Sequence, residues 1–404
     1  MLIVQKYGGT SVANAERINH VAERIADSYL AGNQMVVVLS AQGSLTDRLL
    51  QKAHEINPQA SKRELDMLLT TGEQQSVALM AMALNRLGMP AVSLNAVQIG
   101  LEATDHYGNA RIKCIRTGRI LAELDKGNIV LVAGFQGVNS HGDLTTLGRG
   151  ASNTTAVAIA AVLNADLCEN CTDVDGVYTA DPRVVRDAKK LASITYDEIL
   201  EMSCQVFHNR AAEIAKRYNV KLIIRSSMTE ESGTEVVAQK ESSNMEDLYV
   251  SGVSVDRDVA QISLWGMRGR KAAAFNIFAL LAKEDISVDI ILQTPGANNI
   301  TDISFTVSKQ DSDTALAVLE SNKESLGYEK LTHNLSLAKV SIVGAGMTAS
   351  PGVAAAMFEA LYENDIDIVM ISTSEIKVAV LIDESKAEKA MQVVHEKFAS
   401  FLRV

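Results

Sequence analysis

The stretch that most constrains the fold of this chain is residues 134–161, GFQGVNSHGDLTTLGRGASNTTAVAIAA. It follows an apolar run of strand length at residues 128–133, so it begins at the carboxyl end of a predicted buried strand. Residues 154–163 are rich in alanine, contain neither glycine nor proline, and predict a helix. The stretch is therefore a loop of small residues that leads from a strand into a helix N-terminus.

This loop has the composition of an anion-binding site. Gly148, Gly150 and Ser152 would let a ligand approach the backbone closely. The helix N-terminus offers unpaired N–H groups and the positive end of a dipole. Arg149 adds a forked cation that suits a carboxylate or a phosphate. The alternative is an ordinary strand-to-helix loop with a surface arginine, and only the rest of the chain can decide between them.

Composition narrows the class of protein. A length of 404 residues suggests about two or three domains. Hydrophobic residues make up 47% of the chain and aromatic residues only 4%, so alanine, valine and isoleucine must fill the cores, as in layered α/β proteins. The net charge of −11 and the lack of basic segments with interleaved aromatic residues argue against a nucleic-acid partner. Without a signal peptide or an apolar run of membrane-spanning length, we expect a cytoplasmic protein with no membrane partner.

The N-terminal segment predicts a second phosphate-binding loop. Residues 2–7 form a predicted strand, and residues 15–29 form a predicted helix with one apolar face. Between them Gly8 and Gly9 make a turn whose N–H groups suit a phosphate, and Lys6 places a cation at the strand end. A tight turn with a solvated lysine is the alternative.

Polar residues also follow the next predicted strand, residues 35–39. Ser40 and Thr46 lie just beyond it, at the edge of a parallel sheet where ligands bind in doubly wound folds. In a later helical run, the glycine in residues 70–76 predicts a helix end, a loop and a new helix that presents Glu73. The alternative there is a helix kink with a solvated glutamate.

Residues 167–172 predict another strand, which contains the CxxC pair Cys168 and Cys171. No second CxxC and no HxxxH accompanies the pair, so we predict buried packing thiols and no metal site. Residues 173–183 follow with Asp-Gly and Asp-Pro turn chemistry. Their tyrosine and arginine would suit a nucleotide base and its phosphates, although the aspartates can equally be turn residues.

Five segments agree in order and approximate spacing over roughly the first 230 residues. They are KYGGTSV (6–12), TTGEQQS (70–76), GFQG (134–137), TTLGRG (145–150) and TDVDGVYTADPR (172–183). Together they resemble the aspartate kinase family of the amino-acid kinase superfamily. The resemblance implies a three-layer α/β/α sandwich in residues 1–230. It also implies transfer of the γ-phosphoryl group of MgATP to the β-carboxylate of L-aspartate, the first step towards lysine, threonine and methionine, with no tightly bound cofactor.

The resemblance implies a role for particular residues. Lys6 would meet the phosphates, Arg149 would clamp an aspartate carboxylate, and Glu73 would take the substrate ammonium. The other implied residues are Ser40, Thr46 and Ser152 for aspartate, Gly8, Gly9, Thr172, Asp173, Tyr178 and Arg183 for ATP, and Asn153 in the catalytic group.

Two segments depart from the family pattern. The family usually reads LGRGGSDTT, whereas this chain has Ala151 and Asn153 in place of the second glycine and the aspartate. Residues 201–210 are shorter than the family's EMASLGAKVLHPR and carry Asn209 in place of the proline. These departures leave open a regulatory paralogue that binds amino acid or ATP but phosphorylates poorly. A kinase for another small carboxylate is a third reading.

The C-terminal part contains an internal repeat after a polar, acidic segment, residues 229–247, which predicts a linker. Residues 262–266 resemble 340–344, 278–291 resemble 358–371, and 302–307 resemble 375–380. The repeat resembles paired ACT domains. That resemblance implies two ferredoxin-like βαββαβ layers, at residues 248–330 and 336–404. It also allows the C-terminal strand of the chain to be shared with the first layer.

The two copies differ at the turn before their first helix. The second copy has Ser350, Gly352 and Val353, whose free N–H groups would take an amino-acid carboxylate, while the first has Lys271 and Ala272. We therefore place an effector site, for lysine or threonine, at Ser350, Gly352 and Val353, with Gln293 on the strand edge opposite. A structural dimerisation region without ligand is the alternative. Exposed ACT strands predict a homo-oligomer.

Overall fold

The computed structural model describes residues 1–148, 150–202, 207–238, 249–268, 273–295, 300–345, 347 and 352–402. Arg149, Ser350, Lys271, Ala272 and most of the shortened loop at 203–208 lie outside the described residues. The chain divides into two compact units. The first comprises Met1–Tyr178 and Lys190–Ser243, and the second comprises Thr179–Lys189 and Asn244–Arg403.

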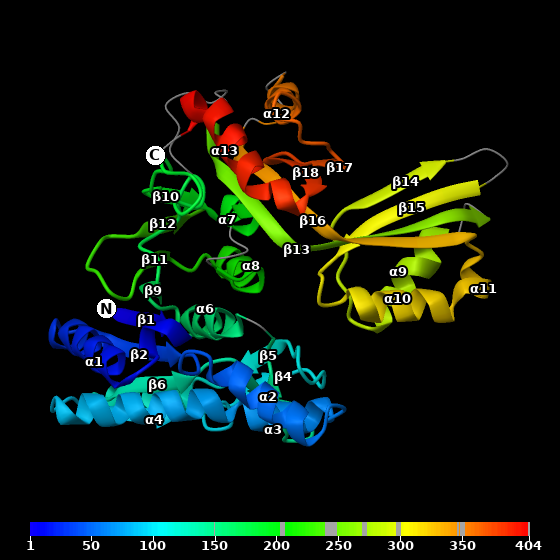
Figure 1. Cartoon of the computed structure of the whole chain (residues 1–404). Helices are drawn as coiled ribbons and strands as arrows, with labels where there is room; N and C mark the ends of the chain where they lie inside the picture. The colour runs from blue at the N-terminus through cyan, green and yellow to red at the C-terminus, as the bar shows by residue number, and fades with distance from the viewer. Residues whose placement is uncertain are drawn as a thin grey trace. The chain divides into compact units, whose positions relative to one another are not determined.

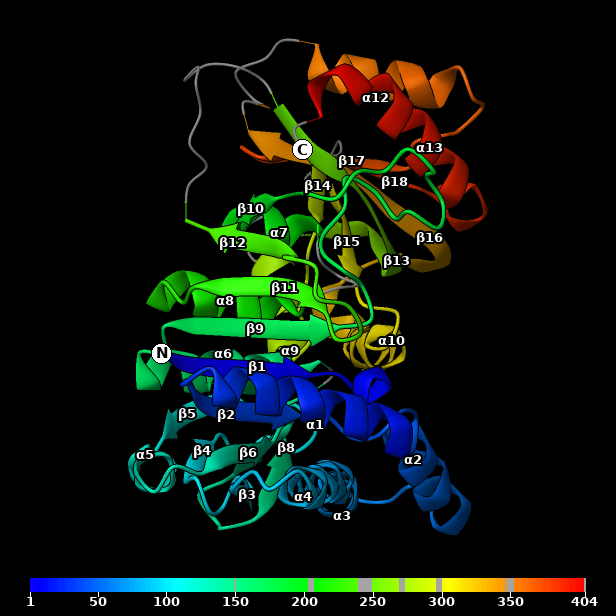
Figure 2. The same cartoon turned by 90° about the vertical axis from the view of Figure 1, so that its left-hand side faces the viewer.

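An eight-stranded sheet forms the centre of the first unit, in the order β10-β12-β11-β9-β1-β2-β6-β3 (Figures 1 and 2). Its strands are β1 (Leu2–Tyr7), β2 (Gln34–Leu39), β3 (Ala91–Leu94), β6 (Ile129–Ala133), β9 (Leu167–Thr172), β10 (Ser193–Thr195), β11 (Leu222–Ser226) and β12 (Thr234–Val237). All neighbours pair in parallel except β11 and β12. The central strands are rich in valine, isoleucine and leucine and are buried, as a parallel sheet covered on both faces requires.

Helices cover both faces of this sheet. Helices α1 (Ala15–Leu30) and α4 (Thr71–Arg86) share a core with Tyr7 and Val37. Helices α6 (Ala151–Leu163) and α8 (Asn209–Tyr218) share the opposite core with Val4. The remaining helices of this unit are η1 (Gly9–Val12), α2 (Leu45–Ile56), α3 (Lys62–Leu69), α5 (Gly118–Asp125) and α7 (Tyr196–Met202). The predicted three-layer α/β/α sandwich is confirmed.

A four-stranded sheet, β5-β4-β7-β8, is attached to the sandwich. Its strands are β4 (Leu101–Ala103), β5 (Ile112–Ile115), β7 (Gln136–Val138) and β8 (Leu144–Thr146). Asp66 of α3, buried to 1% exposure, accepts hydrogen bonds from the Thr146 backbone N–H (2.9 Å), the Thr146 hydroxyl (2.7 Å) and the Gly108 N–H (2.8 Å). Helix α3 therefore holds the strand that leads into the glycine-rich loop.

Six antiparallel strands form the sheet of the second unit, in the order β14-β15-β13-β16-β18-β17. They are β13 (Tyr249–Arg268), β14 (Ile291–Pro295), β15 (Ile300–Val307), β16 (Lys330–Ala345), β17 (Met370–Thr373) and β18 (Lys377–Asp383). Figure 1 shows the long strands β13, in green, and β16, in orange, running through the whole sheet. The helices of this unit are α9 (Ala273–Lys283), α10 (Ser312–Ser321), α11 (Lys323–Leu326), α12 (Val353–Tyr362), η2 (Glu384–Lys386), α13 (Ala387–Lys397) and η3 (Ala399–Phe401).

Both repeats use the two long strands. The second half of β13 shares a core with α9 and α10, through Ile262 and Leu264. Its first half shares another core with α12 and α13, through Val253 and Val255. The second ferredoxin-like layer thus obtains one strand from a segment that precedes the first repeat in sequence.

Two local predictions were wrong. The segment 229–247 is not wholly a linker, because Thr234–Val237 forms β12 and pairs with β11 and β10. The Thr234 hydroxyl donates to the Leu191 carbonyl at 2.7 Å and accepts from the Val177 N–H at 2.8 Å, which anchors this short strand. The loop predicted within residues 70–76 is also absent, since only Thr70, in a helical conformation, separates α3 from α4.

The chain leaves the first unit after Tyr178 and returns to it at Lys190. These two residues face each other in an isolated antiparallel bridge, which forms the base of the excursion. Within the second unit, the Thr179 carbonyl accepts from the Val253 N–H at 2.7 Å, and the Thr179 hydroxyl lies 2.9 Å from His395 Nε2. Residues 179–183 of the predicted nucleotide loop, and residues 184–189 after them, therefore belong to the second unit, whose core includes Ala180 and Val185. No helix in the described ranges could cross a membrane.

Candidate active site

Several predicted site residues that the structure describes in the first unit lie at the carboxyl edge of the eight-stranded sheet. Lys6, near the end of β1, lies opposite Val38 of β2 and Asn170 of β9 in the pairing register. Beyond Lys6 the chain turns at Gly8 and Gly9 into η1. A Cβ atom on Gly9 would lie 2.5 Å from the Ala41 carbonyl oxygen, so this close approach of two strand ends requires glycine.

Lys6 is a buried cation. Its side chain is 9% exposed, and burial lowers its pKa from the ordinary 10.5 to about 8, with the charges of Cys171 and Asp173 acting in the opposite direction. Among the described residues no carboxylate forms an ion pair with its ammonium group. An anionic ligand such as a phosphate would compensate this desolvated charge.

Glu73 provides the complementary buried anion. It lies in the first turn of α4 at 3% exposure, and its Oε1 accepts from the Ala41 N–H at 3.1 Å. Its Oε2 has no hydrogen-bond partner in the part of the chain that the structure describes. Burial raises its pKa from 4.5 to about 7. The arrangement suits a cationic group, such as a substrate ammonium, and excludes the solvated-glutamate alternative.

The N-terminus of α6 lies at the same edge. Its cap, Gly150, has a φ of +68°, a conformation that favours glycine, and the helix begins at Ala151, three residues earlier than predicted. A Cβ on Gly134, just after β6, would lie 2.6 Å from Ser152 Oγ, which shows how closely the helix start approaches the strand end. Asn153 is 7% exposed, and its Oδ1 has no partner among the described residues.

Arg210 is a positioning residue that sequence reasoning missed. Its Nη1 donates to the Leu147 carbonyl at 2.5 Å and to Asn109 Oδ1 at 3.2 Å, and its Nη2 donates to the Ala110 carbonyl at 2.9 Å. It therefore holds the backbone that leads directly into Gly148. The local sequence around Arg210 does not predict this role, because its acceptors lie far away in sequence and are mostly backbone carbonyls.

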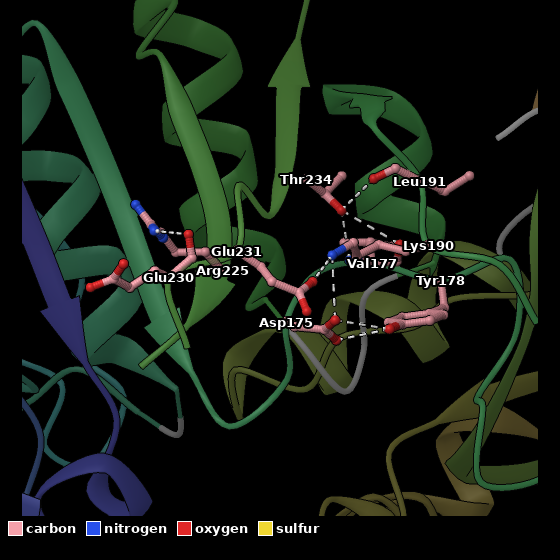
Figure 3. A network of polar contacts seen from close by, with 9 residues as sticks. All are labelled: Asp175, Val177, Tyr178, Lys190, Leu191, Arg225, Glu230, Glu231 and Thr234. Atoms are coloured by element: carbon pink, nitrogen blue, oxygen red, sulfur yellow. Dashed lines mark hydrogen bonds and ion pairs between the residues drawn. The ribbon is translucent and has the colours of Figure 1, made fainter. Parts of the chain in front are cut away.

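The predicted nucleotide loop is held by a polar network, which Figure 3 shows. The Tyr178 hydroxyl donates to both carboxylate oxygens of Asp175, at 2.9 and 3.0 Å. Lys190 Nζ forms an ion pair with Asp175 at 3.4 Å and a closer one with Glu231. The Thr172 hydroxyl at the end of β9 donates to Asp173 Oδ1 at 3.1 Å. Residues 172–178 of the loop are thus fixed by side chains of the first unit.

Arg183 lies in a different unit from Thr172, Asp173 and Tyr178, the other predicted nucleotide-loop residues. It belongs to the second unit, where its guanidinium group bonds both carboxylate oxygens of Asp181. Ser40 and Thr46 are half-buried, at the end of β2 and in the first turn of α2.

The two cysteines of β9 face opposite ways. Cys168 lies in the core beneath α6, and Cys171 lies in the core beneath α1, as strand alternation requires. Burial raises the pKa of both thiols, to about 12 for Cys171. They cannot share one ligand, and the described residues contain no cluster of three or more metal-binding side chains.

The predicted effector residues lie in the second unit. Gly352 is exposed, has a φ of +97° and caps α12, whose first residue, Val353, is buried. Gln293 is exposed on the edge strand β14.

The sandwich with its polar edge, followed by ferredoxin-like layers, defines a small-molecule kinase with a regulatory region. The model of the amino acid kinase family matches residues 1–226, and that of the ACT domain matches residues 262–322 and 340–398. The chain is 47% identical over 400 residues to an aspartokinase of Bacillus sp. (strain MGA3), covering 98% of this chain and 97% of the relative. Aspartokinase 2 of Bacillus subtilis shows the same identity and coverage. The chain belongs to the aspartokinase branch of the amino acid kinase family.

Solved structures agree with this membership. The aspartate kinase of Synechocystis is 42% identical, with a TM-score of 0.55, and the match covers 100% of this chain and 70% of that one. Escherichia coli aspartokinase III, in complex with aspartate and ADP, is 24% identical with a TM-score of 0.86 over 99% of this chain and 100% of that one. The second match supports the fold alone.

Proposed function

We propose that this chain is an ATP-dependent aspartate kinase, which transfers the γ-phosphoryl group of MgATP to the β-carboxylate of L-aspartate. One observation carries the assignment within the site: a buried lysine and a buried glutamate, neither neutralised by a described partner, lie at one sheet edge beside a helix N-terminus. Aspartate brings one ammonium and two carboxylates, and ATP brings phosphates, so the substrates supply the missing opposite charges.

The roles of the residues follow from charge and position. Lys6 neutralises charge on the transferring phosphoryl group, and Gly8 and Gly9 offer backbone N–H groups to the phosphates. Glu73 binds the substrate ammonium, and Arg149 binds a carboxylate. The further substrate contacts in this proposal are Ser40, Thr46 and Ser152 for aspartate and Thr172, Asp173, Tyr178 and Arg183 for ATP. Magnesium enters with the nucleotide as MgATP and keeps most of its ligands from phosphate and water.

The test is ATP consumption by the purified full-length chain, with L-aspartate and with succinate, which has both carboxylates but no ammonium. Aspartate-dependent ADP release, together with an acid-labile acyl phosphate trapped by hydroxylamine, is the expected result. ATP binding without turnover would favour the poorly active paralogue instead, a reading that rests on Asn153 in place of a carboxylate. Turnover with succinate at the aspartate rate would point to another carboxylate substrate.

Regulation and assembly complete the proposal. The ACT region is proposed as a lysine- or threonine-sensing region, with Ser350, Gly352, Val353 and Gln293 in the effector site. A homo-oligomer formed through exposed strands such as β14, a cytoplasmic location, and the domain bounds 1–230, 248–330 and 336–404 belong to the same proposal. Escherichia coli aspartokinase III in complex with lysine and aspartate, a relative in fold, gives the reason to test lysine first.

A further inference from the structure

Asn170 is an anomaly in the core of the first unit. It lies in β9 at 2% exposure, and neither its Oδ1 nor its Nδ2 has a hydrogen-bond partner among the residues that the structure describes. Buried amides are ordinarily satisfied, because an unpaired polar group in the interior is destabilising. A buried amide with both ends unused therefore calls for a partner that comes from outside the chain.

The sheet register directs this amide to the candidate active site. Asn170 lies directly opposite Lys6 on the neighbouring strand, and Figure 2 shows β9 and β1 side by side. Adjacent parallel strands are about 5 Å apart, so side chains at such a pair are neighbours when they point to the same face. Cys168 and Val4, two residues before Asn170 and Lys6, both lie in the core beneath α6. By alternation, Asn170 and Lys6 share that face.

The N-terminal end of α6 lies over the same edge. Further polar atoms without partners in the described ranges, Asn153 Oδ1 and Thr154 Oγ1, belong to its first turns. On the opposite face of β9, both carboxylate oxygens of Glu169 accept hydrogen bonds, one from Gln5 and one from Arg225. Asn170, Asn153 and Thr154 therefore offer hydrogen-bonding atoms on the Lys6 side of the sheet that no described residue uses.

We propose that Asn170 contacts the γ-phosphoryl group of ATP: Nδ2 donates to a phosphoryl oxygen while Oδ1 accepts from the Lys6 ammonium. The proposal rests on the kinase function proposed above and adds a contact to it. A neutral amide suits this position, because it supplies a donor for the phosphoryl oxygens without adding negative charge beside them. No bond is made or broken at Asn170 itself, so it binds and orients the reacting groups.

Asn170→Leu tests the contact, since leucine has nearly the same size and no polar atoms. Without ligand, the variant is expected to unfold at the same or a higher temperature than the wild type, because two unpaired buried polar atoms are removed. Its affinity for a non-hydrolysable ATP analogue is expected to fall about tenfold or more, whereas its affinity for ADP, which lacks the γ-phosphate, changes less than about twofold. Equal effects on the two nucleotides, or none on either, would overturn the proposal.

Two further variants separate a contact from a structural role. Cys168→Ala, on the same strand and face but one residue pair away from the edge, is expected to keep the wild-type ratio of the two affinities. Asn170→Asp keeps the shape but places a carboxylate beside Lys6. Asn170→Asp is expected to lower the affinity for the ATP analogue more than Asn170→Leu does, and to shift the titration of Lys6 to higher pH. A loss of ADP binding and of thermal stability in Asn170→Leu would show a purely structural role and reject the contact. Because these measurements use nucleotides alone, they stand even if aspartate proves not to be the acceptor.

Discussion

The backbone N–H of Ala41 donates to Oε1 of Glu73 at 3.1 Å, which ties the end of β2 to the first turn of α4, while no described residue bonds the second carboxylate oxygen. A Cβ on the preceding Gly72 would lie 2.8 Å from the Ala41 side chain, so this approach depends on glycine. The end of β2 thereby orients the carboxylate of Glu73 and leaves its Oε2 for a substrate cation.

Glu73→Gln should raise the KM for aspartate at least about tenfold, because an uncharged amide keeps the bond to Ala41 but loses the ion pair with the ammonium. Steady-state kinetics with each substrate varied in turn measure this, and the KM for ATP should change little. Since burial places the Glu73 pKa at about 7, the wild-type KM for aspartate should also rise as the pH falls through about 7. A pH limb that persists in the glutamine variant would assign it to another group.

The same shift predicts a stability effect in the unliganded protein. The folded pKa of Glu73 lies above its ordinary value of 4.5, so protonation favours folding. This contribution is complete below pH 4.5 and is lost as the pH rises through about 7. Above that pH, Glu73→Gln should therefore have a larger free energy of unfolding than the wild type, as urea titrations at several pH values can show.

Lys6→Ala should lower kcat by about two to three orders of magnitude, the usual effect of removing a group that stabilises transition-state charge, while the fold survives. Lys52→Ala, an exposed lysine of α2, is the matched control and should retain full activity. Because the Lys6 pKa is lowered to about 8, kcat/KM for ATP should decline above about that pH, where the ammonium loses its proton. Near-normal turnover of the alanine variant would remove Lys6 from the mechanism.

Asn153→Asp should raise kcat. Asn153 is 7% exposed in the first turn of α6, so a carboxylate there gains from the helix dipole but loses hydration, and the variant should unfold at a temperature equal to or below that of the wild type. Comparing kcat and thermal unfolding of the two proteins tests both expectations. An unchanged kcat in a variant that still unfolds near the wild-type temperature would mean that the missing carboxylate does not set the rate.

Lys190→Met should raise the KM for ATP severalfold and leave the KM for aspartate nearly unchanged. Lys190 joins Asp175 to Glu231, and Asp175 in turn holds the Tyr178 hydroxyl, so its loss frees the predicted nucleotide loop (Figure 3). The neighbouring exposed Lys189 provides the control, since Lys189→Met keeps this network. If both variants behave alike, the network has no part in nucleotide binding.

Gly352→Val should abolish or strongly weaken the binding of lysine or threonine, measured by calorimetry. A side chain at a φ of +97° is strained and would distort the turn that offers N–H groups at the start of α12. Gly327→Val places the same strain at a φ of +66° in a turn outside the predicted effector site and should leave binding intact. Unchanged binding in Gly352→Val would exclude this placement, and no binding to the wild type would favour a purely structural repeat.

Much of the fold could be predicted because its signals are local. The alternation of strands and helices could be predicted from apolar runs of strand length, from the amphipathic pattern of residues 15–29 and from the turn glycines. The structure confirms the sandwich and the layered C-terminal region. Where the signal was short or polar, the prediction failed. Thr234–Val237 became a strand because Thr234 binds Val177 and Leu191, residues that no local pattern connects to it.

The sequence by itself determined the fold class, the family and the candidate residues at the strand ends. Strand and helix periodicity and turn chemistry depend on residues that are close together in sequence. The roles of those residues in catalysis and effector binding remain predictions. Only the tertiary structure decided that Glu73 is buried against Ala41, that Asn170 lies opposite Lys6 with no hydrogen-bond partner among the described residues, and that residues 179–189 belong to the second unit. Burial and strand pairing decide these features, and both depend on residues that lie far apart in the chain and meet only when it folds.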